Sequence, residues 1–401
     1  MAAITSVLPS PPPVKGEAGR GSYHKSKGGD REGVSYMGEL KSLYIHVPFC
    51  QAKCHYCSFY SLAGHEDYID SWLDALDIEA ARYYRDSKIA LRTLYVGGGT
   101  PSVLSLTQWQ KLIHIITKYF SLDELQEATS EANPNSLTHD LIKFLEANYF
   151  TRLSLGVQSL NDSELRTLGR LHDSRLALNA MELVRASRLT LSCDLIFAVP
   201  GQTLRTWADS LKKVIEFAEH VSTYQLTLEP ETPLASNYDN EDLNESGYKF
   251  YRYAQYYLPL KNFTQYEISN FAPEKKECLH NLAYWSHDEV IALGPSAVSY
   301  LNHERIKNPS SLQEYFYLAK NNFPDELLPH ERLTPHERAI ELAILNLRTK
   351  WGINRRELLP EVERVISQLP EDLFIITPER IALSKRGMRL GNSIWSEIID
   401  L

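Results

Sequence analysis

Short apolar runs alternate with segments of helical periodicity along most of the chain. Six runs predict strands, because they are rich in apolar and β-branched residues; they cover residues 43–47, 93–96, 127–132, 152–157, 190–197 and 223–228. Between them, apolar residues recur at the three- and four-residue spacing of an amphipathic helix, as in Leu112, Ile115, Ile116 and Tyr119. Six strand–helix repeats predict a parallel sheet. The pattern fits a doubly wound sheet and an incomplete barrel equally well.

The pattern changes beyond about residue 265. A strand-like run covers residues 265–271, and a helix is predicted over 335–347, where Thr334 and Glu337 have the spacing of a capping box. A second helix at 360–368 precedes two short strands at 373–376 and 381–383. Helices followed by a small hairpin predict a compact, winged-helix-like C-terminal domain. In parallel α/β architectures of either kind, functional residues gather at the carboxyl ends of the strands.

We divide the chain into four parts: residues 1–36, 40–265, 266–330 and 331–401. The first is interpreted as a disordered arm, because a Pro11-Pro12-Pro13 run and a Gly28-Gly29 pair leave little apolar surface to bury. A plain tail is favoured over a transit peptide, since the segment is neither free of acidic residues nor clearly amphipathic. Met37 precedes the first strand and is an alternative translation start.

Composition narrows the class of protein. The 401 residues are 43% hydrophobic and 23% charged, which excludes collagen, coiled coil and wholesale disorder. With 42 basic and 51 acidic residues the net charge is −9, so no broad cationic field is expected to hold nucleic acid. No apolar window reaches the ~18 residues that a transmembrane helix needs, so a soluble protein is expected. Five cysteines, an odd number, favour a reducing, cytoplasmic location.

Three of the cysteines follow the first predicted strand within eight residues: Cys50, Cys54 and Cys57. Three thiolates on one short loop can hold a metal without a distant segment. A structural zinc would need a fourth ligand, from His46, His55 or a distant group. An ordinary 4Fe-4S cluster would need a fourth thiolate. If these three hold a cluster, one iron stays open for another ligand.

This C-x3-C-x2-C spacing, with Tyr56 before the last cysteine, resembles the radical S-adenosylmethionine (SAM) superfamily. The resemblance implies a 4Fe-4S cluster on Cys50, Cys54 and Cys57. It also implies that the open iron binds the amino and carboxylate groups of an exchangeable SAM, which the cluster can cleave to a 5'-deoxyadenosyl radical.

Further motifs fall where such a site would lie. The run GGGTPS at residues 97–102 follows the second predicted strand and lacks the P-loop pattern. Glu131, Gln158 and Asp194 each lie near the carboxyl end of a predicted strand, where polar groups can bind a ribose or adenine. Arg170 belongs to the same set. Each of these residues taken singly is as well explained by a structural ion pair or cap.

Within this superfamily, the chain resembles the oxygen-independent coproporphyrinogen III oxidase branch in particular. The resemblance is carried by residues 44–50 (YIHVPFC), 97–102 (GGGTPS), 156–159 (GVQS) and 194–201 (DLIFAVPG). It implies an incomplete TIM-like (β/α)6 barrel with a small winged-helix-like C-terminal domain. The SAM contacts that it implies are Tyr44, Tyr56, Gly98, Gly99, Thr100, Glu131, Gln158, Arg170 and Asp194. Ala198 and Ser58 stand where relatives often have Gly and Asp.

Two features separate the chain from the oxidases. Those enzymes have a fourth cysteine two residues after the third, and here that position is Phe59. Residues 280–285 (HNLAYW) are similar to the H-N-x-x-Y-W motif of HemW-type heme chaperones. The motif implies heme binding by His280, Tyr284 and Trp285, since imidazole is a common axial ligand of heme iron and aromatic rings pack on a porphyrin.

We therefore expect a heme chaperone that passes heme to an apo-hemoprotein, a membrane-bound one included. No catalytic residue is assigned. The alternative is an oxidase that decarboxylates two propionates of coproporphyrinogen III. His280 without the family match would be interpreted as a packed core histidine, and a Cys278–His280 half-site for a metal is a weaker idea. Two basic pairs, Arg305 with Lys307 and Arg355 with Arg356, are candidates for propionates or lipid headgroups, although small basic clusters usually form plain surface.

Overall fold

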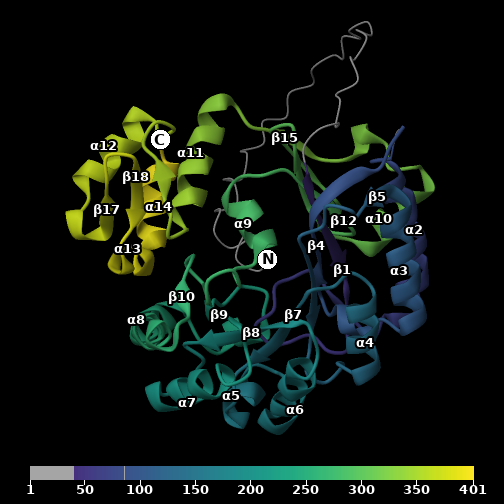
Figure 1. The fold of residues 1–401 in the computed structure, drawn as a ribbon, viewed down its shortest axis with the longest axis horizontal. Helices are drawn as coiled ribbons and strands as arrows, with labels where there is room; N and C mark the ends of the chain where they lie inside the picture. Colours follow the sequence, from purple (N-terminus) through teal and green to yellow (C-terminus); the bar gives the residue numbers. More distant parts are fainter. Residues whose placement is uncertain (1–39, 85) are drawn as a thin grey trace, which may run out of the picture.

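The computed structural model describes residues 40–84 and 86–401, without the side chains of 241–246 (Figure 1). The expectations for the arm at 1–36 and for Met37 fall outside these residues. The division of the remaining chain into three parts stays an interpretation.

Six parallel strands form the centre of the molecule, side by side in the order β9-β8-β7-β6-β4-β1. Their bounds are β1 Lys41–Val47, β4 Ile89–Gly98, β6 Glu127–Ala132, β7 Arg152–Gln158, β8 Thr190–Phe197 and β9 His220–Gln225. In the described chain, β1 and β9 do not pair, so the sheet stays open. The predicted incomplete (β/α)6 barrel is therefore confirmed, and the doubly wound alternative is wrong.

Helices cover the outer face of this sheet, with α2, α3 and α4 on one flank and α5, α6 and α7 on the other (Figure 1). Their apolar stripes supply the core: three tryptophans, Trp72, Trp109 and Trp207, are fully buried beneath them. Polar caps fix where several helices begin, as Ser105 does for α3 through a capping box. The bounds are α2 Ile69–Ala81, α3 Leu106–Tyr119, α4 His139–Ala147, α5 Asp162–Thr167, α6 Ser174–Arg185, α7 Leu204–Val214 and α8 Asn240–Tyr257.

The sheet extends beyond the six strands on both edges. The hairpin β10 (Thr264–Gln265) and β11 (Asn270–Ala272) joins β9, and β12 (Val290–Leu293) runs parallel to β1. Further antiparallel strands follow β12, and α9 lies between the barrel and the C-terminal part (Figure 1). The remaining elements of this region are α9 Leu279–Trp285, β13 Val298–Leu301, β14 Glu304–Lys307, α10 Leu312–Lys320 and β15 His330–Arg332; short strands elsewhere are β2 Phe49–Cys50, β3 Leu62–Ala63 and β5 Phe120–Ser121.

Two strand predictions are corrected. The sixth strand covers 220–225 rather than 223–228, because its partner β8 ends at Phe197, opposite Gln225. Leu226 and Leu228 are buried in the core as a non-strand segment, which explains the misleading apolar pattern. The run at 265–271 is a tight hairpin rather than one strand, because the Glu267 carboxylate accepts a hydrogen bond from the Ser269 amide at 2.9 Å and closes a turn.

The C-terminal part has its own three-stranded antiparallel sheet, packed on helices in a winged-helix-like arrangement. A separate apolar cluster holds it together, with Ile344, Leu347 and Ile398 at its centre. The predicted capping box of Thr334 and Glu337 is present. The bounds are α11 Pro335–Leu347, β16 Ile353–Asn354, α12 Pro360–Gln368, β17 Phe374–Ile376, β18 Arg380–Leu383, α13 Lys385–Arg389 and α14 Gly391–Ile399.

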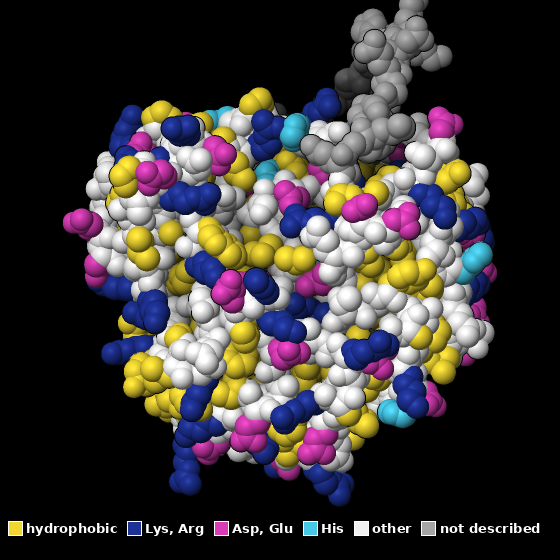
Figure 2. Space-filling view, in the orientation of Figure 1, with side chains coloured by type: hydrophobic (Ala, Val, Ile, Leu, Met, Phe, Trp, Pro, Cys, Tyr) yellow, Lys and Arg dark blue, Asp and Glu magenta, His cyan; other side chains and the backbone are white. Residues whose placement is uncertain are grey.

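The surface carries charges of both signs. On the face in Figure 2, Lys and Arg side chains lie interspersed with Asp and Glu. Of the helices in the described ranges, none has the length and apolar content needed to cross a bilayer.

Candidate functional site

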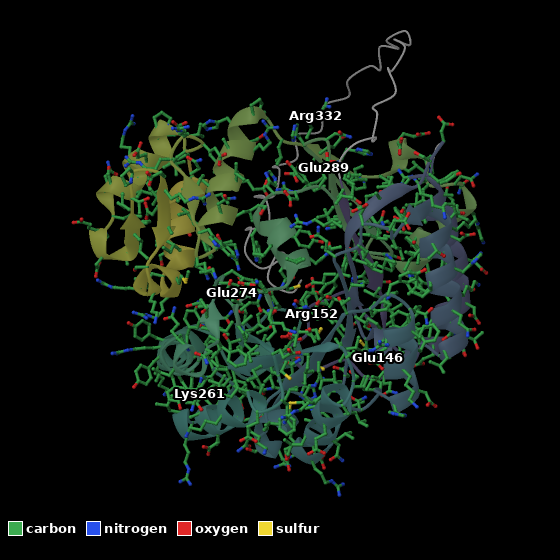
Figure 3. All side chains as sticks on the ribbon, in the orientation of Figure 1. Glu146, Arg152, Lys261, Glu274, Glu289 and Arg332 are labelled. Carbon is green, nitrogen blue, oxygen red and sulfur yellow. The ribbon has the colours of Figure 1, made fainter. Side chains whose placement is uncertain are left out.

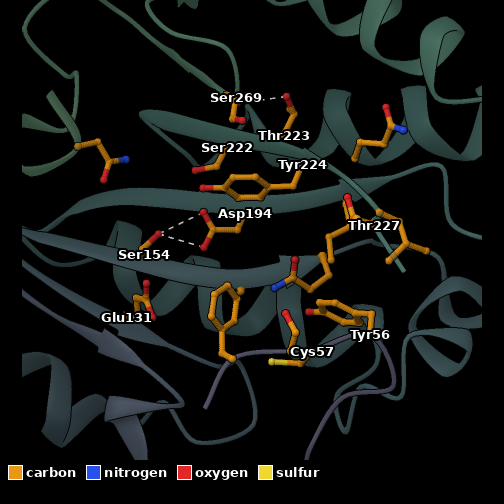
Figure 4. Close-up of a pocket in the computed structure, with 18 of the residues that line it drawn as sticks. Tyr56, Cys57, Glu131, Ser154, Asp194, Ser222, Thr223, Tyr224, Thr227 and Ser269 are labelled. Carbon is orange, nitrogen blue, oxygen red and sulfur yellow. Dashed lines mark hydrogen bonds between the residues drawn. The ribbon is translucent and has the colours of Figure 1, made fainter. Parts of the chain in front are cut away.

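A cavity of about 950 Å³ lies at the carboxyl ends of the barrel strands and continues to the C-terminal part (Figure 4). Every residue that the sequence analysis assigned to a cluster or to SAM lines it. They are Tyr44, Cys50, Cys54, Tyr56, Cys57, Gly98, Gly99, Thr100, Glu131, Gln158, Arg170 and Asp194. Residues from five of the parallel strands and their loops thus meet in one place, as the topology of a partial barrel requires.

The cysteine loop follows β1 and is held by hydrogen bonds to its sulfurs. The Thr100 hydroxyl donates to the Cys50 sulfur at 3.3 Å, and the Arg170 guanidinium donates to the Cys54 sulfur at 3.2 Å. All three cysteines are half-buried and form no disulfide. Donors directed at sulfur stabilise thiolates, which is the form that binds iron or zinc.

Burial raises the pKa of the Cys50 thiol, and it raises the pKa of the Cys57 thiol to about 11. Both thiols are therefore protonated near neutral pH until a metal displaces the protons. The proposed zinc ligand His46 already uses both ring nitrogens, at 2.9 Å to the Tyr44 hydroxyl and 2.8 Å to the Tyr60 carbonyl. His46 is thus engaged elsewhere and does not complete a zinc site.

The donor set fits an iron–sulfur cluster. In the described ranges, no three His, Cys, Asp or Glu side chains surround a single ion position. The thiolates of a cubane bind separate irons, so its ligands need not meet at one point. Cys50, Cys54 and Cys57 on a cavity wall, with sulfur-directed donors behind them, meet that requirement.

The glycine run lets the backbone pass close to the cysteine loop. Gly98 has φ +108°, and a Cβ there would lie 2.6 Å from the ring of His46. A Cβ on Gly99 would lie 2.6 Å from the carbonyl oxygen of Phe49. Only glycine fits these positions without moving β1 or the loop that follows it. The Gly98 amide is left to donate to Glu131 at 3.0 Å.

Glu131 is fixed by two donors. Its second oxygen accepts a hydrogen bond from the Tyr95 hydroxyl at 2.8 Å, and burial raises the pKa of the carboxyl. Tyr95 was missed by the sequence analysis. The available signal was its position on β4, two residues before the glycine run.

Asp194 lies on the wall of the cavity that β8 provides. The Ser154 hydroxyl reaches both of its oxygens, at 3.2 and 3.1 Å (Figure 4), and burial raises the pKa of the Asp194 carboxyl. Gln158, at the end of β7, has φ +64°. A left-handed conformation is unusual for a residue other than glycine and often marks a functional position.

Asn133 joins two of the predicted residues and was also missed. Its side-chain oxygen accepts from Arg170 at 2.5 Å, and its amide nitrogen donates to the Thr100 hydroxyl at 2.9 Å. Asn133 therefore orients both of the groups that donate to cysteine sulfurs. It follows β6 directly, two residues after Glu131, and that position was the signal.

The predicted heme residues are placed differently from one another on α9. The His280 side chain is fully buried and does not line the cavity, whereas Tyr284 does. Nδ1 of His280 lies 2.8 Å from the Thr93 hydroxyl, and Nε2 has no hydrogen-bond partner among the described residues. Burial lowers the pKa of His280 to about 3, so its imidazole is neutral at physiological pH.

Trp285 contacts the C-terminal part of the chain and does not line the cavity. Its ring lies against the guanidinium of Arg348, 4.2 Å from the ring centroid. The three residues of the motif are thus not gathered around one open space in this conformation.

A buried ion pair anchors the segment before α9. Arg152, in the interior of the molecule (Figure 3), pairs with Glu127 at 3.1 Å and donates to the carbonyls of Lys276 and Glu277. The other Glu127 oxygen accepts from the Cys278 thiol at 3.3 Å and from the His280 amide at 3.1 Å. Cys278 is therefore engaged with a carboxylate, and the structure gives no support to a Cys278–His280 metal half-site.

Comparisons with known proteins find relatives over most of the chain. The model of the radical SAM superfamily matches residues 44–214. The heme chaperone HemW of Lactococcus lactis is 32% identical over 376 residues, covering 89% of this chain and 97% of that protein. HemW of Bacillus subtilis is 32% identical over 378 residues, covering 90% and 99%. Among solved structures, coproporphyrinogen III oxidase (HemN) from Escherichia coli has a TM-score of 0.78 at 21% identity over 90% of both chains, a likeness of fold alone.

Proposed function

This chain belongs to the HemW heme chaperone family within the radical SAM superfamily, and from that premise we propose that it binds heme and passes it to an apo-hemoprotein. The proposed acceptors are hemoproteins, membrane-bound ones included. The cytoplasm is the proposed compartment, supported by five cysteines that form no disulfide in the described chain.

The cavity is proposed to hold a 4Fe-4S cluster on Cys50, Cys54 and Cys57 with SAM beside it. When bound, these groups supply one-electron cleavage of a sulfonium. The chain's own residues orient the nucleotide: the backbone at Gly98 and Gly99 allows a close approach, and the Asp194 and Glu131 carboxyls offer acceptors. The remaining walls come from Tyr44, Tyr56, Thr100, Gln158 and Arg170.

The buried Nε2 of His280, which has no hydrogen-bond partner among the described residues, is the observation that carries the chaperone proposal. A buried nitrogen without a hydrogen-bond partner costs about 1–3 kcal/mol, and coordination to iron would remove that cost. Because His280 is fully buried, the side chains that cover Nε2 must move before heme iron can reach it. Tyr284, which already lines the cavity, would then pack against the porphyrin.

The second candidate is oxygen-independent coproporphyrinogen III oxidation, favoured by the shared fold. Phe59 stands where the oxidase pattern has its fourth cysteine, so the chaperone is the better-supported function.

The test is an anaerobic hemin titration of the purified, cluster-loaded protein. Wild type should give a stoichiometric Soret band, and His280→Ala should lose it. His114→Ala, an exposed histidine on α3, is the matched control and should bind as wild type does. Equal binding by both variants would refute His280 as the ligand. SAM-dependent formation of protoporphyrinogen from coproporphyrinogen III, without heme binding, would favour the oxidase.

A further inference from the structure

One end of the cavity contains buried hydrogen-bond donors that lack acceptors. This end is formed by α13, α14 and the residue after α11, Arg348, all of which line the cavity. Arg348 is 1% exposed, and neither its Nε nor its Nη1 has a hydrogen-bond partner in the described part of the chain. Buried donors in native proteins are nearly always paired, so an unpaired guanidinium calls for an explanation.

The guanidinium of Arg348 is held between two indoles. Its carbon lies 4.2 Å from the ring centroid of Trp285 on α9 and 4.9 Å from that of Trp395 on α14. The indole nitrogens of Trp285 and Trp395 are also buried without an acceptor in the described ranges. Stacking keeps the charge in place but satisfies none of its N–H groups.

The neighbouring carboxylate of Glu267 does not accept a hydrogen bond from Arg348. Glu267 is fully buried, and its nearest oxygen is 3.9 Å from Arg348 Nη2, an ion pair beyond hydrogen-bond distance. Arg389 adds a second cation on the same wall. Its Nη1 donates to the side-chain amide oxygen of Gln255 at 2.7 Å, and its Nε has no partner in the described chain.

We propose that Arg348 and Arg389 form a subsite for a carboxylate of the bound tetrapyrrole, at the end of the cavity away from the cysteine loop. This inference rests on the proposed function and adds the group that fixes the orientation of the cargo. Guanidinium groups bind carboxylates through paired, charge-assisted hydrogen bonds, which suits a propionate. Tyr248, half-exposed beside Arg389, offers an aromatic face for the macrocycle.

Trp285 has a specific role at this subsite. It acts as a positioning residue that holds Arg348, so α9 carries both the proposed iron ligand His280 and the support of the propionate subsite. The basic residues suggested by the sequence are less suitable: Arg305 pairs with Glu331 and Glu341, and Arg355 pairs with Glu363.

The test compares hemin with hemin dimethyl ester, whose propionates carry no charge. Soret titrations of the full, cluster-loaded chain give a dissociation constant for each. In wild type the ester should bind at least about tenfold more weakly than hemin. In Arg389→Gln this ratio should fall toward one, with the ester affinity unchanged. Arg356→Gln, an exposed arginine of the same C-terminal part, is the control and should keep the wild-type ratio.

A second variant guards against misfolding. Arg348→Lys retains charge but loses the paired donors, and its iron content and thermal midpoint report whether the chain is intact. If the ratio in folded Arg348→Lys also falls, the subsite is supported. Equal binding of hemin and ester by wild type overturns the subsite and leaves heme binding by the chain intact. An ester penalty that persists in Arg389→Gln also overturns it. If wild type binds neither compound, the proposed function fails and the subsite fails with it.

Discussion

The imidazole of His280 is stacked on the ring of Tyr95, with centroids 5.1 Å and planes 28° apart. The hydroxyl of the same tyrosine donates to Glu131, on the part of the cavity wall proposed to bind SAM. One side chain therefore touches both the proposed iron ligand and a proposed SAM contact, although Tyr95 and His280 belong to different elements.

Tyr95→Phe separates these two contacts. The substitution keeps the stacked ring and removes the hydrogen bond to Glu131, which is worth about 1 kcal/mol or somewhat more when the acceptor is charged. SAM should bind about tenfold more weakly, as measured by anaerobic calorimetry, while hemin affinity without SAM stays unchanged. Weaker hemin binding by Tyr95→Phe would show that the ring alone does not support His280.

Cys54→Ala should remove the proposed cluster, because one of its three cysteine ligands is lost and Arg170 loses its sulfur acceptor. Iron content and brown absorbance should both fall to background after anaerobic reconstitution. Cys193→Ala, at a fully buried cysteine on β8, is the matched control and should keep its iron. Full iron in Cys54→Ala would refute the assigned ligands.

Gly98→Ala should abolish SAM binding. The added methyl group would lie 2.6 Å from His46 and would force an unfavourable φ of +108°, at a cost of about 1–3 kcal/mol in unfolding free energy. Gly201→Ala is the control. Gly201 has a comparable φ of +81°, but no atom lies within 4 Å of the new Cβ, so the variant has a strained backbone and should still bind SAM. Equal SAM affinity in both variants would contradict the close-approach argument.

Arg152→Met should destabilise the chain by about 3–5 kcal/mol, because it leaves the buried Glu127 carboxylate without its cation. Urea unfolding provides the measurement, and hydrogen exchange should quicken in α9, whose preceding carbonyls lose their donor. Arg188→Met is the control: the Arg188 side chain is exposed where it pairs with Glu146, so a change of at most about 1 kcal/mol is expected. Similar losses in both variants would argue against an anchoring role for Arg152.

Acid should destabilise the fold through His280. Burial lowers its folded pKa to about 3, so between that value and about 6.5 the unfolded chain binds a proton that the folded chain does not. The stabilisation is complete above about pH 6.5 and is lost as the pH falls. His46 and His172, each with a pKa lowered by burial to about 4, act in the same direction.

His280→Gln should reduce this pH dependence by up to about 1.4 kcal/mol per pH unit, read from urea midpoints at pH 7 and pH 5.5. His114→Ala, at an exposed position, should leave the slope as in wild type. An unchanged slope in His280→Gln would mean that the imidazole is accessible to protons in the folded chain.

The local pattern was enough to predict most of the elements. β6 and β8 match their predicted bounds, as do α11 and α12, because alternation, capping residues and helix-starting prolines act over a few positions. The order of the strands in the sheet was left open by this pattern, and only the strand pairing decided between a doubly wound sheet and an incomplete barrel. The failures, at 223–228 and 265–271, occurred where pairing with a distant strand or a side-chain turn overrode the apolar pattern.

The sequence by itself determined the cysteine spacing, the glycine run and the polar residues at strand ends, since each depends on neighbours in the chain. Only the tertiary structure decided what touches these groups. Asn133 between Arg170 and Thr100, Thr93 against His280, and Trp285 against Arg348 join residues from separate elements. Such contacts depend on strand register and on how α9 packs between the barrel and the C-terminal part, and no local pattern encodes them. Burial has the same origin: the motif shows a histidine beside aromatic residues, but only the packing encloses His280 and leaves Arg348 with unfilled donors.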